Sequence, residues 1–137
     1  MEKNKINLLY SKETDIIINS FYKVYNTLGY GFLEKVYENS LLVELQKNNL
    51  LVSQQHPIKV YYDSLIVGEY FADLVVNDKI ILELKTARLL SKENEYQLIN
   101  YLKATGFEVG LLLNFGEKAE FVRKIFTKNN NKSAEIS

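Results

Sequence analysis

Residues 65–85 read LIVGEYFADLVVNDKIILELK, in which two apolar runs flank Asn77-Asp78. The first run, residues 65–76, is rich in β-branched and aromatic residues, which favour β-strands. Asn-Asp is typical of a tight turn, so residues 79–85 are predicted to fold back on the first run as a hairpin. Charged residues interrupt both runs where a buried strand would carry apolar side chains. We therefore expect an antiparallel hairpin with unusual polar groups.

The carboxylates of this hairpin are the first candidates for a functional site. Glu83 and Lys85 point to the same face of the second strand, opposite Leu82 and Leu84. Pairing around the turn places Asp73 opposite Glu83 or one step from it. Two carboxylates at that separation repel each other unless a cation or a proton lies between them. A divalent metal is the most economical answer, and Lys85 would stabilise negative charge or position a water beside it.

Two other interpretations of the same residues stay open. A Glu-x-Lys pair in a strand is commonly a cross-strand ion pair on a solvated face. Asp73, Glu83 and Lys85 could also form a buried ion network that Lys85 completes without any metal. Measurement of metal binding separates these structural interpretations from the metal site.

The rest of the chain alternates between helical and strand-like periodicity. Helices are predicted at residues 12–28, 32–47 and 91–105, and further strands at residues 58–62, 108–115 and 119–126. Residues 50–54 are an optional short strand outside this set. The predicted order is ααβββαββ, and the simplest arrangement is an α/β fold with a central mixed β-sheet flanked by helices.

Composition limits the function classes. The 137 residues fit one domain, residues 1–126, followed by a polar tail, residues 127–137, that is expected to be flexible. Seventeen basic and seventeen acidic residues balance, so no global field draws the chain to DNA or to an anionic membrane. With no cysteine and one histidine, a metal would be held mainly by carboxylates, which suit Mg²⁺ or Mn²⁺. Neither a signal peptide nor a membrane span is evident, so a cytoplasmic location is expected.

Glu34 is the second polar anomaly. At 3.6 residues per turn it lies on the same stripe as Tyr37, Leu41 and Leu45. A carboxylate in an apolar stripe is costly to bury unless it is paired or bound to a metal. An acidic residue at a helix N-terminus is also favoured by the helix dipole, and the sequence leaves these two interpretations open.

Gln97 and Tyr101 form a third candidate pair. They lie four residues apart and therefore share one face of the helix predicted at residues 91–105. Such a pair is more often a set of ordinary boundary residues than a binding site. His56 and the strand tyrosines are likewise expected to be structural.

Five short motifs together resemble a known family. Gly31 to Tyr37 reads G-x-x-E-x-x-Y, the signature of the GxxExxY family of small bacterial proteins. The resemblance covers about residues 12–126. It continues through the segments Tyr70-Phe71-Ala72-Asp73-Leu74, Glu83-Leu84-Lys85, Gln97 with Tyr101 and Leu102, and Gly110 with Asn114, Phe115 and Gly116. That family is similar to a branch of the PD-(D/E)XK nuclease superfamily.

The resemblance implies a restriction-endonuclease-like core and a role for each candidate residue. Asp73 and Glu83 would ligate Mg²⁺ or Mn²⁺, with Glu34 as a further acidic ligand, and Lys85 would assist the attacking water. Gln97 with Tyr101 matches the Q-x-x-x-Y element of RecB-like nucleases, which borders the active site and contacts the nucleic-acid backbone. Ala72 stands where the superfamily's name has proline, a loosely kept position.

The expected function is metal-dependent hydrolysis of nucleic-acid phosphodiester bonds, with DNA favoured over RNA. The alternative is a non-catalytic nucleic-acid- or protein-binding module that keeps the nuclease fold, which the zero net charge favours. A homodimer is also expected, because a chain this short offers little surface to grip a duplex.

Overall fold

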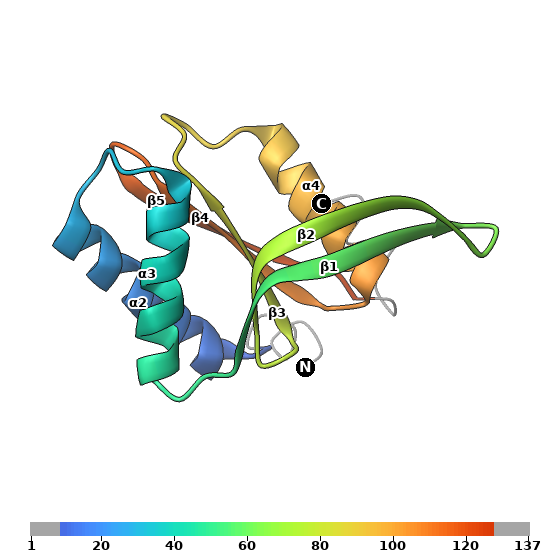
Figure 1. Cartoon of the computed structure of the whole chain (residues 1–137), viewed down its shortest axis with the longest axis horizontal. Helices are drawn as coiled ribbons and strands as arrows, with labels where there is room; N and C mark the ends of the chain where they lie inside the picture. Colours follow the sequence, from blue (N-terminus) through green and yellow to red (C-terminus); the bar gives the residue numbers. More distant parts are fainter. Residues whose placement is uncertain (1–8, 128–137) are drawn as a thin grey trace.

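The computed structural model describes residues 9–127 (Figure 1). Its elements follow the predicted order ααβββαββ. They are α2 (Ser11–Leu28), α3 (Glu34–Lys47), β1 (Val52–Tyr62), β2 (Leu65–Val76), β3 (Ile80–Lys85), α4 (Lys92–Thr105), β4 (Val109–Phe115) and β5 (Ala119–Ile125). The predicted α/β fold is confirmed.

The strands form one mixed, five-stranded sheet in the order β1-β2-β3-β4-β5. Neighbouring strands are antiparallel except β3 and β4, which are parallel. A parallel pair needs a long crossover, and α4 supplies it. The β1–β2 hairpin extends from one side of the molecule well beyond the remaining strands (Figure 1).

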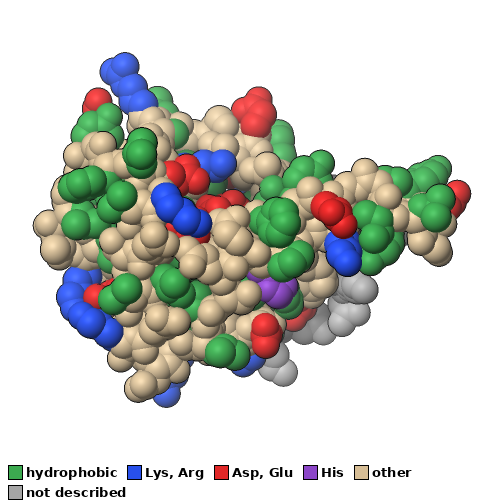
Figure 2. Space-filling view, in the orientation of Figure 1, with side chains coloured by type: hydrophobic (Ala, Val, Ile, Leu, Met, Phe, Trp, Pro, Cys, Tyr) green, Lys and Arg blue, Asp and Glu red, His purple; other side chains and the backbone are tan. Residues whose placement is uncertain are grey.

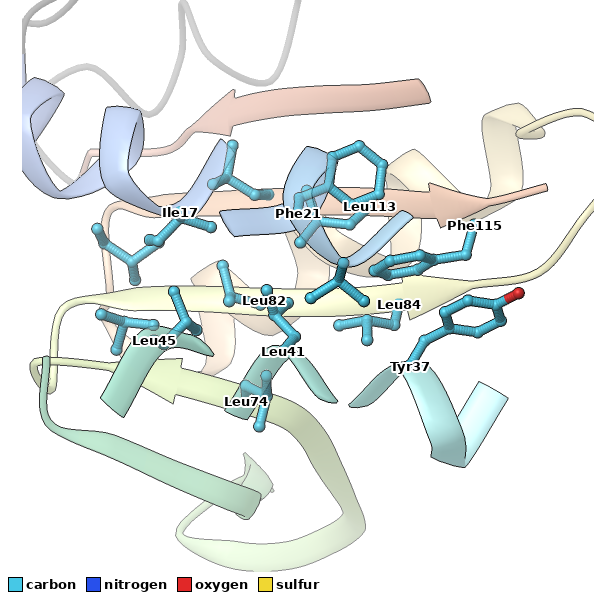
Figure 3. Close-up of a cluster of buried hydrophobic side chains, with 14 of the residues drawn as sticks. Ile17, Phe21, Tyr37, Leu41, Leu45, Leu74, Leu82, Leu84, Leu113 and Phe115 are labelled. Carbon is cyan, nitrogen blue, oxygen red and sulfur yellow. The ribbon is translucent and has the colours of Figure 1, made fainter. Parts of the chain in front are cut away.

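Helices cover both faces of the sheet, so β3 buries apolar side chains on both sides. Leu82 and Leu84 pack with α2 and α3, whereas Ile81 packs with α4. On the first face, Tyr37 and Phe115 close one end of a continuous apolar layer (Figure 3). A central strand buried on both faces has no solvated side for charged residues. Glu83 is therefore a buried carboxylate within the sheet rather than part of a solvated ion pair.

The β2–β3 hairpin turns at Asn77-Asp78 as the sequence predicts, and β1 and β2 are joined by a similar turn at Asp63-Ser64. Asn77 and Asp78 each have a φ of 53°, and the Lys79 N–H donates to the Val76 carbonyl at 3.0 Å. Asp63 and Ser64 also have positive φ angles, of 50° and 66°. Positive φ at both central residues matches the twist of two-residue hairpins.

The strand β1 differs from its prediction. The optional strand at residues 50–54 and the strand at residues 58–62 are one continuous element, which pairs with β2 from Val52 to Tyr62. The intervening SQQHP segment has little strand propensity, so pairing with β2 decides its conformation. Pro57 is tolerated because β1 is an edge strand.

The predicted flexible tail lies outside the described residues except for Thr127, whose side chain is buried. Residues 1–8 of the predicted domain also lie outside them. Between residues 9 and 127, no helix is long and apolar enough to cross a membrane.

Candidate functional site

The site begins where β2 and β3 separate. Their ladder ends at the Leu74–Leu82 pair, and the next step in register would join Asp73 to Glu83. Beyond that pair, side-chain carboxylates instead of backbone carbonyls accept hydrogen bonds from the backbone N–H groups. The Leu84 N–H donates to Asp73 Oδ2 at 2.8 Å, and the Asp73 N–H donates to Glu83 Oε1 at 3.3 Å. The structure thus brings together the two acids that the sequence placed opposite each other or one step apart.

Strand β1 is also distorted, at the position opposite Asp73. Gln55 falls between the paired residues Gln54 and His56, opposite Asp73, but has a left-handed φ of 52°. Its side-chain amide donates to Glu38 Oε1 at 3.0 Å and lies 3.5 Å from Asp73 Oδ1. A left-handed non-glycine residue inside a strand is a local strain that surrounding contacts must hold. Gln55 thus links α3 to the carboxylate pair.

Glu38 is a member of the site that the sequence analysis missed. Its side chain is only 4% exposed and accepts hydrogen bonds from Lys35 Nζ at 2.8 Å, Gln54 Nε2 at 2.6 Å and Gln55 Nε2 at 3.0 Å. A buried carboxylate needs several donors of this kind. The signal in the sequence was its position, one helical turn after Glu34.

Glu34 is the first residue of α3, and its placement depends on the turn before the helix. Gly31 has a φ of 117°, which only glycine adopts without strain. The Tyr37 hydroxyl donates to the Gly29 carbonyl and accepts from the Phe32 N–H, which closes the turn. The Tyr37 ring stacks on Phe115 with centroids 4.4 Å apart. The G-x-x-E-x-x-Y motif therefore fixes where the Glu34 carboxylate enters the site.

Burial is the main influence on the charges of the acids. Burial, together with the nearby negative charge of Asp73, raises the pKa of Glu83 to about 9. Burial also raises the pKa of Asp73 and that of Glu34. The negative charge of Asp73 raises the pKa of Glu34 as well. Lys85 lowers the pKa of all three carboxyls without offsetting these effects. Without a cation, the Asp73–Glu83 pair therefore retains a proton at neutral pH.

The donor set suits a hard divalent cation, because carboxylate oxygens are the ligands that Mg²⁺ and Mn²⁺ prefer. Within residues 9–127, however, no three His, Cys, Asp or Glu side chains are arranged to hold a metal ion. The predicted trio of Asp73, Glu83 and Glu34 is thus not a preformed ligand set. Mg²⁺ is commonly held by only one or two carboxylates, with water and phosphate oxygens completing its shell. Asp73 and Glu83 fit that description.

Of the remaining predicted residues, Lys85 and Tyr101 interact with the charges of this pair, whereas Gln97 lies in a neighbouring groove. Lys85 is half-buried and follows Glu83 on the same side of β3. Tyr101 of α4 is 8% exposed, and burial and the Glu83 charge raise its pKa to about 12, so its hydroxyl keeps its proton. Gln97, one turn earlier on α4, is exposed and lines a groove together with Tyr101. Figure 2 shows charged side chains of both signs gathered between α3 and the hairpin.

Close packing explains why the last motif has glycine at positions 110 and 116. The Asn114 side chain binds both the N–H and the carbonyl of Ala87, at 2.9 and 2.8 Å. A Cβ at Gly116 would lie 2.2 Å from the Ala87 oxygen, and one at Gly110 would lie 2.6 Å from Leu98 Cδ1. The motif therefore fixes the loop that follows Lys85 and the packing of α4.

Comparisons with known proteins agree with this fold. The crystal structure of SSO0001 aligns with a TM-score of 0.56 and 17% sequence identity, covering 97% of this chain and 66% of that one. At this identity the likeness shows a shared fold. No curated protein matches the sequence. The model of the PD-(D/E)XK nuclease superfamily matches residues 11–125, almost all of the described part. The chain therefore belongs to the PD-(D/E)XK nuclease superfamily.

Proposed function

We propose that this chain is a divalent-metal-dependent nuclease that hydrolyses phosphodiester bonds, in DNA more readily than in RNA. The Asp73–Glu83 pair carries the proposal. It stands where two buried strands separate, and both carboxyls have a raised pKa. Acids whose pKa values are perturbed by burial and by a specific charged neighbour cluster at functional sites. Membership of a nuclease superfamily supports the reaction class.

The chain's own residues have separate roles in this proposal. Asp73 and Glu83 would hold Mg²⁺ or Mn²⁺, with Glu34 as an additional acidic group across from Asp73. When bound, such a cation polarises the scissile phosphate and lowers the pKa of a water. The Lys85 ammonium would stabilise the negative charge that develops on the phosphate. The Tyr101 hydroxyl, which keeps its proton, would donate to the substrate backbone.

Glu38 and Gln55 position the first carboxylate rather than react. Gln55 touches both Glu38 and Asp73, so the buried Glu38 orients the amide that faces Asp73 Oδ1. Groups that orient metal-binding carboxylates usually matter nearly as much as the ligands themselves. This arrangement makes the site depend on α3 as well as on the sheet.

We also infer that the chain belongs to the GxxExxY branch of the superfamily, as a bacterial, cytoplasmic enzyme. The support is that each residue of the motif has its own task. Gly31 makes the turn, Glu34 faces the acids, and Tyr37 fixes the turn to the core.

A cleavage assay tests the proposed function. Purified protein is incubated with single-stranded, duplex and branched DNA, and with RNA, in Mg²⁺, Mn²⁺ or EDTA. Cleavage is expected only with a metal, and Glu83→Gln and Asp73→Asn are expected to abolish it. Asp15→Asn, at an exposed position of α2, is the matched control and should cleave like the wild type. Equal activity of wild type and Glu83→Gln, or no activity in either, contradicts the proposal.

One observation favours a second function, a non-catalytic binding module. The net charge of the chain is zero, so no overall field draws it to a long nucleic-acid substrate. A module that binds nucleic acid would show affinity that falls steeply with salt while no strand is cut. A module that binds protein would show no salt-dependent nucleic-acid affinity.

A further inference from the structure

A groove of about 870 Å³ lies between α4 and the β1–β2 hairpin. Its walls carry four tyrosines, two from each side, which are Tyr61 and Tyr70 on the hairpin and Tyr96 and Tyr101 on the helix. Tyr61, Tyr70 and Tyr96 are 59%, 47% and 60% exposed, so their rings are open to a ligand. Figure 2 shows hydrophobic side chains along the projecting hairpin that forms one wall.

Tyr101 links the groove to the carboxylate pair. Its side chain lines the groove, with its ring 5.8 Å from that of Tyr70, and the charges of Glu83 and Asp73 raise its pKa. A strand that reached the acids with one phosphate would therefore place neighbouring nucleotides along the groove. The two walls are a paired hairpin and a capped helix, so the backbone positions of the four tyrosines are set by the fold before any ligand binds.

We propose that this groove binds unpaired nucleobases by stacking on its tyrosines, so that the substrate is single-stranded nucleic acid or a strand with an unpaired end. This inference rests on the proposed function, since it names the substrate class of that site. Every base presents an aromatic face, so a row of tyrosines accepts bases of any sequence.

The charge of the groove favours bases over the backbone of a duplex. Glu93 and Lys103 both line it, and the whole chain has no net charge. Affinity for a duplex depends mainly on contacts between Lys or Arg and many phosphates. Stacking of bases on aromatic side chains adds affinity for a single strand beyond its phosphate contacts. The groove thus suits the parts of a nucleic acid that pairing would hide.

The test measures binding of fluorescein-labelled probes by anisotropy in EDTA, where no cleavage occurs. The probes are an oligothymidylate of about 12 nucleotides, a typical single-strand site size, an abasic strand of equal length and a matched duplex. The wild type should prefer the oligothymidylate to both others. Tyr61→Ala and Tyr96→Ala should each weaken that binding by at least about fivefold and leave the abasic strand unaffected.

Tyr62→Ala is the matched control. Tyr62 is the next residue on the hairpin, is 71% exposed and does not line the groove. It should bind like the wild type. Circular dichroism and thermal melting should be unchanged in all three variants, because the replaced rings are exposed.

The failures of the two proposals are distinguishable. If the protein cuts DNA with Mg²⁺ but Tyr61→Ala and Tyr96→Ala bind and cut like the wild type, the groove proposal is overturned and the nuclease stands. If base-dependent binding is lost in these variants while the wild type never cuts, the groove proposal is supported and the nuclease proposal is overturned. If Tyr61→Ala only converts a dimer to a monomer in sedimentation, with oligothymidylate binding intact, the groove is an interface between copies and the proposal is overturned.

Discussion

The backbone N–H of Leu84 donates to the Asp73 carboxylate at 2.8 Å, where the ladder of β2 and β3 would otherwise continue. A side chain from one strand thus replaces the backbone carbonyl that would accept this bond. The exchange lets the strands separate without an unsatisfied N–H, since buried backbone donors need a partner. It also places Asp73 beside Glu83, so the opening in the sheet and the acid pair have a common cause.

The raised pKa of Glu83 makes the stability of the metal-free protein depend on pH. Below pH 4.5, its ordinary value, both the folded and the unfolded state hold the proton, and burial has little electrostatic cost. Between that pH and about 9 the unfolded state releases a proton that the folded state keeps, so stability falls as pH rises. The contribution of Glu83 is a loss of up to about 1.4 kcal/mol per pH unit.

Urea unfolding in EDTA at several pH values between 5 and 9 measures this effect. Glu83→Gln removes the titrating group while keeping its size. The variant should match the wild type at pH 5 and exceed its free energy of unfolding increasingly toward pH 9. Parallel pH profiles for the two proteins would show that Glu83 titrates normally.

Glu38→Gln tests whether the buried acid of α3 positions Asp73. The substitution keeps the volume but removes a charge that accepts from Lys35, Gln54 and Gln55. Affinity for Mn²⁺ and any cleavage rate should fall by about 10- to 100-fold, as is usual for groups that orient metal ligands. The control is Glu44→Gln on the same helix, which removes a carboxylate paired with Lys23 outside the site. If Glu38→Gln binds Mn²⁺ and cleaves like the wild type, Glu38 does not position Asp73.

Tyr37→Phe separates the two tasks of the last residue in the G-x-x-E-x-x-Y motif. The ring can still stack on Phe115, but the hydroxyl no longer bridges Gly29 and Phe32. Loss of these bonds at a buried position should lower the free energy of unfolding by about 1–2 kcal/mol, as measured by urea denaturation. Tyr30→Phe, at a residue that is 58% exposed, should change it little. Equal stability of both variants would mean that the turn does not need the hydroxyl.

Asn114→Ala tests the loop that follows Lys85. Asn114 is fully buried, and its removal leaves the N–H and carbonyl of Ala87 without their partner. The expected loss of stability is about 1–3 kcal/mol. Asn26→Ala, on the exposed side of α2, is the comparison and should be near neutral. If Asn114→Ala melts at the wild-type temperature, the loop is held by other contacts.

The sequence was most informative where periodicity and turn chemistry agree. The helices α2, α3 and α4, the Asn77-Asp78 turn and the strands β2 to β5 were predicted within a few residues, and the approach of Asp73 to Glu83 followed from register alone. Residues 55–57 of β1 were missed because their conformation depends on pairing with β2. Their propensity could not indicate a strand.

Glu38 and Gln55 were not predicted, for a related reason. A glutamate on a helix and a glutamine in a polar segment are ordinary surface residues until α3 packs against the sheet. Their role arises from the Glu38–Gln55–Asp73 contacts, which join segments distant in the sequence. Local patterns identify residues that break a rule, such as Glu83 in an apolar strand, but not those that follow the rules and become important through packing.

Calorimetric titration of Mn²⁺ into the wild type tests the central claim that Asp73 and Glu83 form a metal site. At pH 7.5, in two buffers with different ionisation enthalpies, we expect binding that releases about one proton, because the pKa of Glu83 is about 9 before the cation binds. Asp73→Asn and Glu83→Gln should lose this binding, and Asp15→Asn should keep it. No heat of binding at millimolar Mn²⁺, or equal binding by Glu83→Gln, would contradict the account. Asp73, Glu83 and Lys85 would then form a buried ion network.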